Sequence, residues 1–157
     1  MQDRIKRWLY RNGRPGRVAG ALNAMFRWAG SAGIGGSRLC TLEVRGRRTG
    51  KLTSFPVVVT DYEGERYVVA MLGESANWVA NLRAADCQAV LRHGDREAVR
   101  LEEVESVRRA PILKRYLEVA PGARAHVPVD RRASPAEFEA IASQYPVFRV
   151  RVETPRA

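Results

Sequence analysis

Residues 39–60 read LCTLEVRGRRTGKLTSFPVVVT, and this stretch predicts the β character of the chain. Apolar and polar residues alternate over residues 39–44, which is the pattern of a half-buried strand, and residues 53–60 read as a second strand. Between them lies RGRRTGK at 45–51, four cations and two glycines in seven residues. We therefore expect a basic loop held between two strands.

The rest of the chain alternates further strands with helices. The pattern predicts a hairpin of residues 53–60 with 66–72, a second hairpin of 88–92 with 97–104, and a last strand at 147–152. It predicts helices at 76–85, 106–119 and 136–145, with Ser75 as the first N-cap and Ser134 as the last. Five or six antiparallel strands with inserted helices indicate an α+β protein around a small barrel.

The basic excess of the chain lies in its first third. The 157 residues carry a net charge of +10, and residues 1–51 hold 12 Lys and Arg against two acids, while residues 52–157 balance. This asymmetry points to an anionic partner for the first third. Apolar residues at 45% and charged residues at 28% exclude a disordered chain, a collagen-like chain and a disulfide scaffold.

We divide the chain into a basic amphipathic helical segment, residues 1–36, and a single domain, residues 37–157. Two interpretations of the segment stay open: residues 1–30 lie on an anionic membrane, or they pack across the barrel with their cations in water. No run approaches the roughly 20 apolar residues of a membrane span, and residues 19–36 do not read as a signal peptide. We therefore expect a cytoplasmic protein, with peripheral contact to the inner face of the cell membrane under the first interpretation.

Two stretches carry candidate chemistry. The loop 45–51 combines glycines, which let backbone N–H groups turn toward an anion, with arginines, whose fork matches phosphate or carboxylate oxygens. A solvated basic turn is an equal alternative on composition alone. In residues 73–82 a small-residue turn opens a helix on which Asn77 and Asn81 share a face, as Trp78 and Leu82 do. The alternative there is that Trp78 and Leu82 are core and the asparagines face water.

Acid–base equipment is sparse in this sequence. We find no Ser-His-Asp set and no metal-ligand cluster, and His93 reads as a turn residue. The protein is therefore either not an enzyme or an enzyme whose cofactor supplies the reaction.

The same stretches carry a family resemblance. LEVRGRRTGKL at 42–52, followed by Phe55-Pro56-Val57, and then VVAMLG at 68–73 and NWVANLRA at 77–84, resemble the actinobacterial deazaflavin-dependent nitroreductase/quinone reductase family. The resemblance covers about residues 38–105, and YPVF at 145–148 fits it too. Two motifs in the same order and at the right separation make it more specific than either motif alone.

The resemblance implies a split β-barrel of the FMN-binding type, an antiparallel Greek-key barrel, that binds the deazaflavin coenzyme F420, with FMN as the runner-up. The implied reaction is hydride transfer to a small-molecule acceptor: a quinone, an enone or a nitro compound. The implied cofactor-binding residues are Arg47, Arg48, Thr49, Gly50 and Lys51 for the anionic tail, Pro56, Val57, Leu72 and Gly73 for the ring, and Asn77, Trp78 and Asn81 on the helix that closes the slot. Tyr116 and Tyr145 are the candidate catalytic proton donors, and no metal is implied.

Two other classes of function are compatible with parts of this sequence. A split barrel can also hold a lipid, heme or flavin without turnover, so a non-catalytic binding protein is the alternative. A nucleic-acid module would interleave aromatic residues with cations on a strand face, but here the cations gather in one loop and the N-terminal segment, so we expect no nucleic-acid partner. We expect a monomer or a homodimer.

Overall fold

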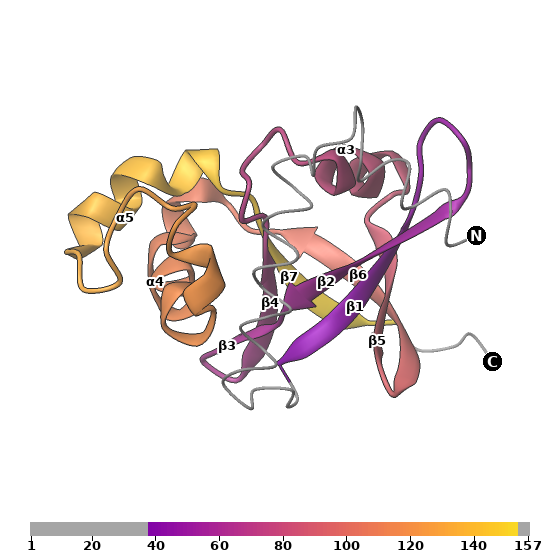
Figure 1. Cartoon of the computed structure of the whole chain (residues 1–157), viewed down its shortest axis with the longest axis horizontal. Coiled ribbons are helices and arrows are strands. Elements are labelled where there is room, and N and C mark those ends of the chain that lie inside the picture. Colours follow the sequence, from indigo (N-terminus) through magenta and orange to yellow (C-terminus); the bar gives the residue numbers. More distant parts are fainter. Residues whose placement is uncertain (1–37, 154–157) are drawn as a thin grey trace.

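The computed structural model describes residues 38–153 (Figure 1), so the predicted helical segment 1–36 and its membrane contact lie outside the described residues. The strands are β1 (Leu39–Arg45), β2 (Leu52–Val58), β3 (Thr60–Tyr62), β4 (Glu65–Val69), β5 (Gln88–His93), β6 (Asp95–Glu103) and β7 (Val147–Val152). The α-helices are α3 (Asn77–Ala84), α4 (Ala110–Val119) and α5 (Pro135–Ile141), and short 3-10 helices are η2 (Ser106–Arg108), η3 (Pro121–Ala123) and η4 (Ala142–Gln144).

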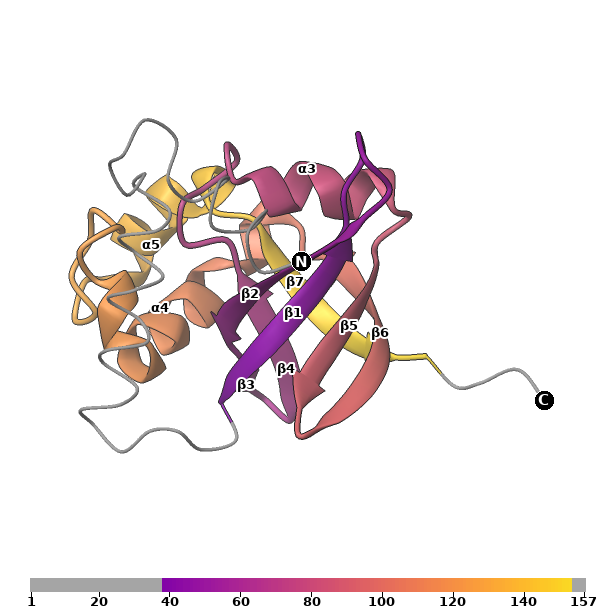
Figure 2. The same cartoon turned by 45° about the vertical axis from the view of Figure 1, so that its right-hand side comes forward.

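One antiparallel sheet with the order β2-β1-β5-β6-β7-β4-β3 curls into a split barrel (Figure 2). Its two edge strands, β2 and β3, are consecutive in the chain, so the sheet nearly closes on itself. The prediction of one continuous strand over 53–60 is wrong, because the chain leaves the pairing with β1 after Val58 and joins β4 from Thr60 onward. Seven strands therefore stand where five or six were expected.

The apolar runs near the seam of the barrel are buried on both faces of the sheet. In β2, β4 and β7, neighbouring residues such as Val57 and Val58, or Val68 and Val69, belong to different hydrophobic clusters. Successive side chains of a strand point to opposite faces, and both faces are covered here. This double burial explains why these strands read as nearly continuous hydrophobic stretches.

The first cluster, which we call the barrel core, fills the inside of the curled sheet. Leu42 and Val44 of β1 are fully buried there, and α3 closes one end with Val79 and Leu82. Burying one such side chain contributes about 1.5–3 kcal/mol. Because the barrel core holds α3 in place, it also sets the position of every polar side chain that α3 carries.

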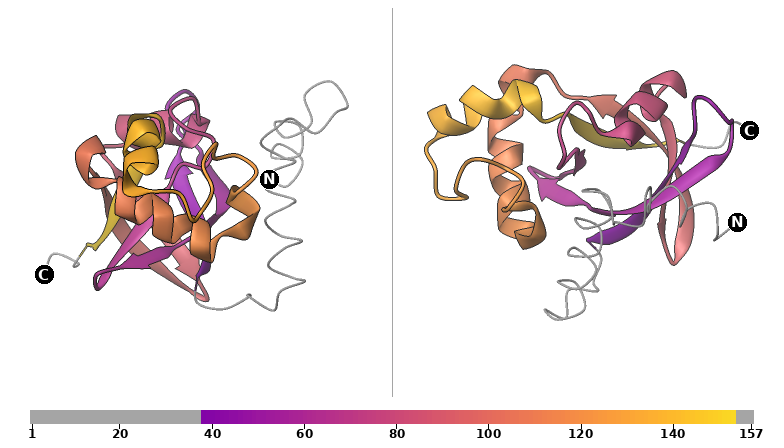
Figure 3. Two further views of the ribbon diagram at one scale, coloured as in Figure 1. Left: turned by 90° about the vertical axis from the view of Figure 1, so that its left-hand side faces the viewer. Right: turned by 45° about the horizontal axis from the view of Figure 1, so that its top comes forward.

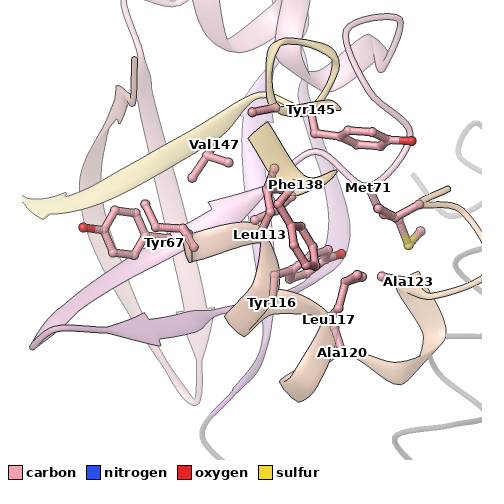
Figure 4. Close-up of a cluster of buried hydrophobic side chains, with 14 of the residues drawn as sticks. Tyr67, Met71, Leu113, Tyr116, Leu117, Ala120, Ala123, Phe138, Tyr145 and Val147 are labelled. Atoms are coloured by element: carbon pink, nitrogen blue, oxygen red, sulfur yellow. The ribbon is translucent and has the colours of Figure 1, made fainter. Parts of the chain in front are cut away.

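The second cluster, which we call the helical layer, is formed by side chains of α4, α5 and the strands that they cover. The helices lie together on one side of the sheet (Figure 3). Leu113, Tyr116 and Leu117 of α4 meet Phe138 of α5 over the outer faces of β4 and β7 (Figure 4). The spacing of the α4 residues, i, i+3 and i+4, is that of one helix face. The helical layer thus gives the domain a second hydrophobic core.

The helix caps agree with the sequence at α5 and differ at α3. Ser134 and Glu137 form a capping box, which confirms the predicted start of α5. Ser75 does not cap α3: the N-cap is Ala76, which makes no side-chain cap bond. The turn is formed instead by Gly73, whose φ of +81° suits glycine, and whose carbonyl accepts the Ala76 amide at 3.1 Å.

Candidate functional site

The basic loop between β1 and β2 is a closed turn with its own hydrogen bonds. The Gly46 amide donates to the Lys51 carbonyl at 2.7 Å, and the Gly50 amide donates to the Gly46 carbonyl at 2.9 Å. Gly50 has a φ of +68°, and a Cβ on Gly46 would lie 3.1 Å from Thr49 Oγ1. The two glycines of the motif are therefore needed by the turn itself.

The loop is joined to α3 through Arg47. One guanidinium nitrogen of Arg47 donates to Asn77 Oδ1 at 2.8 Å and to Asn81 Oδ1 at 2.7 Å. The Arg47 backbone amide donates to the same Asn81 oxygen at 3.1 Å. Asn81 is only 4% exposed, so the alternative that both asparagines face water does not hold for it.

Other donors of the loop have no partner in the part of the chain that the structure describes. The exposed side chains of Arg48 and Lys51 make no hydrogen bond or ion pair with residues 38–153, and the backbone amides of Arg48 and Thr49 donate to none of them. Two cations and two adjacent amides are what a phosphate or a carboxylate needs. This donor set fits the anionic tail that the sequence motif implies.

An aromatic group closes the barrel end beside the loop. Trp78 of α3 packs between Phe55 of β2 and Phe148 of β7, with ring centroids 5.5 Å apart in both pairs. Pro56 and Val57 follow Phe55 on β2, which is an edge strand of the sheet. Within residues 38–153 no strand pairs with the outer backbone edge of β2, so its backbone groups can bond a flat ring there.

The turn before α3 is held from two sides. A Cβ on the buried Gly73 would lie 2.9 Å from the Gln144 carbonyl oxygen, so the turn approaches η4 closely. Arg83 of α3 donates to Glu74 at 3.0 Å and also bonds Glu103 of β6. The hydrogen bond from Arg83 lowers the pKa of the Glu74 carboxyl. Leu72, beside this turn, packs against both the barrel core and the helical layer.

The two candidate proton donors lie in the helical layer, together with Met71. Tyr116 is 2% exposed, and within residues 38–153 its hydroxyl has no hydrogen-bond partner; burial raises its pKa. The Tyr145 hydroxyl donates to the His126 carbonyl at 3.0 Å, and burial raises its pKa too. Both phenols therefore keep their protons at neutral pH.

The structure thus sorts the implied site residues into two groups. The loop 46–51, α3 and the neighbouring part of β2 lie together at one end of the barrel, and the two tyrosines lie in the helical layer. Phe55, Phe148 and Arg83 belong to the first group and are absent from the sequence assignment. Phe55 and Phe148 stand inside the quoted motifs, but only the strand order shows that Trp78 meets both.

The described residues hold neither a metal-ligand cluster nor a membrane-spanning helix. No group of three or more His, Cys, Asp or Glu side chains within residues 38–153 lies where it could hold a metal ion. None of the helices in this range has the length and hydropathy that a membrane span requires.

The chain is similar to a family of known proteins. A family model described as F420H(2)-dependent quinone reductase matches residues 24–133 of this chain. No curated protein matches it.

Solved structures share the fold at low sequence identity. A protein of unknown function from Agrobacterium tumefaciens has a TM-score of 0.55 and 14% identity over 75% of this chain and 49% of its own. A heme binding protein from Mycobacterium smegmatis has a TM-score of 0.51 and 16% identity over 89% of this chain and 52% of its own. An F420-H2 dependent reductase, FDR-A, has a TM-score of 0.49 and 16% identity over 73% of this chain and 95% of its own. The chain therefore spans about half the length of the first two proteins.

Proposed function

This chain belongs to the F420H2-dependent quinone reductase family, and from that premise we propose that it is an F420H2-dependent reductase. We propose that its acceptor is a small electrophile: a quinone, an enone or a nitro compound. When bound, the reduced deazaflavin supplies the hydride. The residues of this chain bind the coenzyme, orient its ring and exclude water from it.

The observation that carries this proposal is the set of unpartnered donors in the basic loop. Arg48 and Lys51 are exposed cations without a carboxylate partner among the described residues, and the amides of Arg48 and Thr49 stand beside them. Coenzyme F420 carries a phospholactyl-oligoglutamate tail, and charge-assisted hydrogen bonds are the strong way to hold such a tail. In our proposal the turn at Thr49 and Gly50 presents these donors to it.

The apolar residues beside the loop are the second support for this proposal, because they suit the ring of the coenzyme. Pro56 and Val57 lie on β2, an edge strand among residues 38–153, and the Leu72-Gly73 turn approaches η4. Trp78 packs between two phenylalanines with its ring tilted to both. In our proposal these residues form the walls of the slot. A rigid, largely apolar slot positions the ring against its acceptor.

For the proton that must accompany the hydride, we propose Tyr145 or Tyr116 as the donor. Burial raises the pKa of both phenols, so each is protonated at neutral pH. The Tyr145 hydroxyl already donates to the His126 carbonyl, so donating a proton elsewhere requires it to leave that bond. A donor role predicts that the Phe variant loses kcat while its coenzyme affinity is unchanged.

The first test is a fluorescence titration of the purified protein with oxidised F420, with FMN and heme titrated in parallel. We expect micromolar or tighter binding of F420 alone, followed by oxidation of reduced F420 when a quinone, an enone or a nitro compound is added. Binding of FMN or heme in place of F420, without turnover, would support the non-catalytic binding protein instead.

A matched pair of variants ties the binding to the loop. We expect Arg48→Ala combined with Lys51→Ala to weaken F420 binding at least tenfold, because hydrogen bonds to charged groups contribute roughly 1.5–3 kcal/mol each. Arg108→Ala removes the same kind of charge from the exposed η2 and should leave the affinity unchanged. Equal affinities for all these proteins would mean that the tail does not lie on the loop.

We also propose that the protein is cytoplasmic and that residues 1–30 contact an anionic membrane, which would suit a membrane-borne quinone. The support is the basic and amphipathic sequence of that segment alone. Flotation with anionic liposomes tests it: the full chain should float, and a full-length variant with Arg4, Lys6 and Arg7 changed to Glu should not. Equal flotation of the two would contradict the membrane contact.

A further inference from the structure

Arg47 belongs to the basic loop by sequence, but its side chain is bonded to α3. We propose that Arg47, Asn77 and Asn81 form a clamp that positions the loop, and that these three residues do not themselves bind the tail of the coenzyme. Of the side-chain cations next to the tail, this leaves Arg48 and Lys51 to contact it. The inference rests on the proposed function and changes the role of three residues within it.

The clamp holds an arginine without cancelling its charge. Arginine is only a donor, so the side-chain oxygens of Asn77 and Asn81 must face it, and neither oxygen carries a full negative charge. Arg45 follows the same rule, because it donates to the Gly50 carbonyl at 2.5 Å. The loop is thereby fixed in shape while its positive field is kept.

Elsewhere in the described chain, many arginines form ion pairs with carboxylates. Carboxylates pair with Arg38, Arg66, Arg83, Arg92, Arg96, Arg100, Arg115, Arg149 and Arg151. In residues 38–153 no ion pair includes Arg45, Arg47, Arg48 or Lys51. A loop whose four cations are all left without acids is suited to receive an anion, because nothing must be displaced first.

The hydrogen bonds of the clamp make its three members unequal. Asn81 accepts both from the Arg47 side chain and from the Arg47 backbone amide, and it is 4% exposed. Arg47→Ala would therefore leave the backbone bond in place, whereas Asn81→Ala removes both bonds. Asn77 accepts a single bond at an exposed position. We expect the loop to loosen most in Asn81→Ala, less in Arg47→Ala and least in Asn77→Ala.

The first experiment needs no coenzyme. Hydrogen exchange of the loop amides should show the Arg47 amide protected in the wild type, and Asn81→Ala should raise its exchange rate at least tenfold. Arg47→Ala should raise the rate of the residue 47 amide much less. If the amide exchanges equally in the wild type and in Asn81→Ala, the clamp does not exist in solution.

The second experiment measures binding of oxidised F420 and of the tail-less deazaflavin. We expect Asn81→Ala to bind F420 at least tenfold more weakly and the tail-less compound as the wild type does. The fold-loss of Asn81→Ala should be the same at about 50 and 300 mM salt, because no charge is removed, whereas that of Arg48→Ala should shrink as salt screens it. Adding Arg47→Ala to Asn81→Ala should cost little more, since the clamp is already broken.

Asn81→Asp distinguishes the position of the loop from its positive charge. It also retains the hydrogen-bond acceptor, so it provides a second test if Asn81→Ala fails to fold. The aspartate accepts both hydrogen bonds, so the Arg47 amide should stay protected from exchange. Its carboxylate neutralises the charge of Arg47, so F420 binding should become weaker and less dependent on salt. Arg108→Ala serves again as the charge-matched control, with unchanged affinity expected.

The outcomes that would overturn the clamp are distinct from a failure of the proposed function. A larger loss in Arg47→Ala than in Asn81→Ala, shrinking with salt, would make Arg47 a direct ligand of the tail. Additive losses in the double variant would do the same. If the wild type binds no F420, the proposed function fails, while the exchange experiment still decides whether the clamp exists.

Discussion

The loop end of the barrel and the helical layer are built in opposite ways. At the loop end, polar side chains are joined by hydrogen bonds to uncharged acceptors, and two of the exposed cations, Arg48 and Lys51, have no partner among residues 38–153. In the helical layer, large apolar and aromatic side chains are buried against one another. Packed apolar side chains provide stability, whereas exposed cations contribute very little to it. The two regions should therefore respond differently to substitution.

The largest effect is expected from removing the side chain at the centre of the helical layer. Phe138 is 0% exposed, so Phe138→Ala should lower the free energy of unfolding by about 3–5 kcal/mol. Urea denaturation measures this loss, and Val107→Ala, at a residue 80% exposed, is the control that should change little. The F420 affinity of the folded fraction should stay unchanged. A parallel loss of affinity would show that the two regions do not act separately.

A second substitution tests the turn that joins the two regions. Gly73→Ala should destabilise the fold by roughly 1–2 kcal/mol for its positive φ alone, and by more because its Cβ would lie 2.9 Å from the Gln144 carbonyl oxygen. Gly64→Ala is the matched control, since Gly64 has a φ of +78° with nothing within 4 Å of the added Cβ. The free energy of unfolding of both variants, measured by heat or urea, separates the cost of the positive φ from the cost of the close contact with Gln144. Equal losses would mean that the approach to η4 has no cost.

Within the helical layer, the hydroxyls of Tyr145 and Tyr116 should differ in how much each stabilises the fold. Tyr145→Phe removes the hydrogen bond to the His126 carbonyl and should cost about 0.5–1.5 kcal/mol. Tyr116→Phe removes a hydroxyl that has no partner within residues 38–153, so it should be nearly neutral or slightly stabilising. Urea denaturation of the two variants shows which one loses more free energy of unfolding. The reverse order would mean that the Tyr116 hydroxyl has a partner in solution.

The smallest effect is expected at the exposed ion pair that fixes the turn to α3. The hydrogen bond from Arg83 lowers the pKa of Glu74, so the pair stabilises the fold above the ordinary glutamate pKa of about 4.3. That contribution is lost as pH falls through the lower pKa of the folded state. Because both side chains are over 40% exposed, we expect no more than about 1 kcal/mol. Arg83→Leu should flatten the fall of stability with acid, and Arg108→Leu should leave it unchanged.

The sequence predicted the elements of the fold better than their contacts. Alternation located the β1–β2 unit, the β5–β6 hairpin and β7, and the Ser134 capping box located α5, because these signals lie within a few residues. The sequence does not predict the break after Val58, because an apolar run looks the same whether a strand continues or changes its partner strand. The prediction that Ser75 caps α3 is wrong, because it depends on residue type alone, whereas Gly73 forms the turn.

By itself, the sequence determined the strands, the basic glycine loop and the family of the chain, because period, turn chemistry and motif order are local properties. Only the tertiary structure decided that Arg47 bonds Asn77 and Asn81, 30 and 34 residues away, while Arg48 beside it has no partner in residues 38–153. Two adjacent residues of the same type therefore differ in their contacts, because one bonds α3 and the other has no partner among residues 38–153. The difference depends on where α3 packs, and that position is set by long-range burial of Val79 and Leu82 in the barrel core.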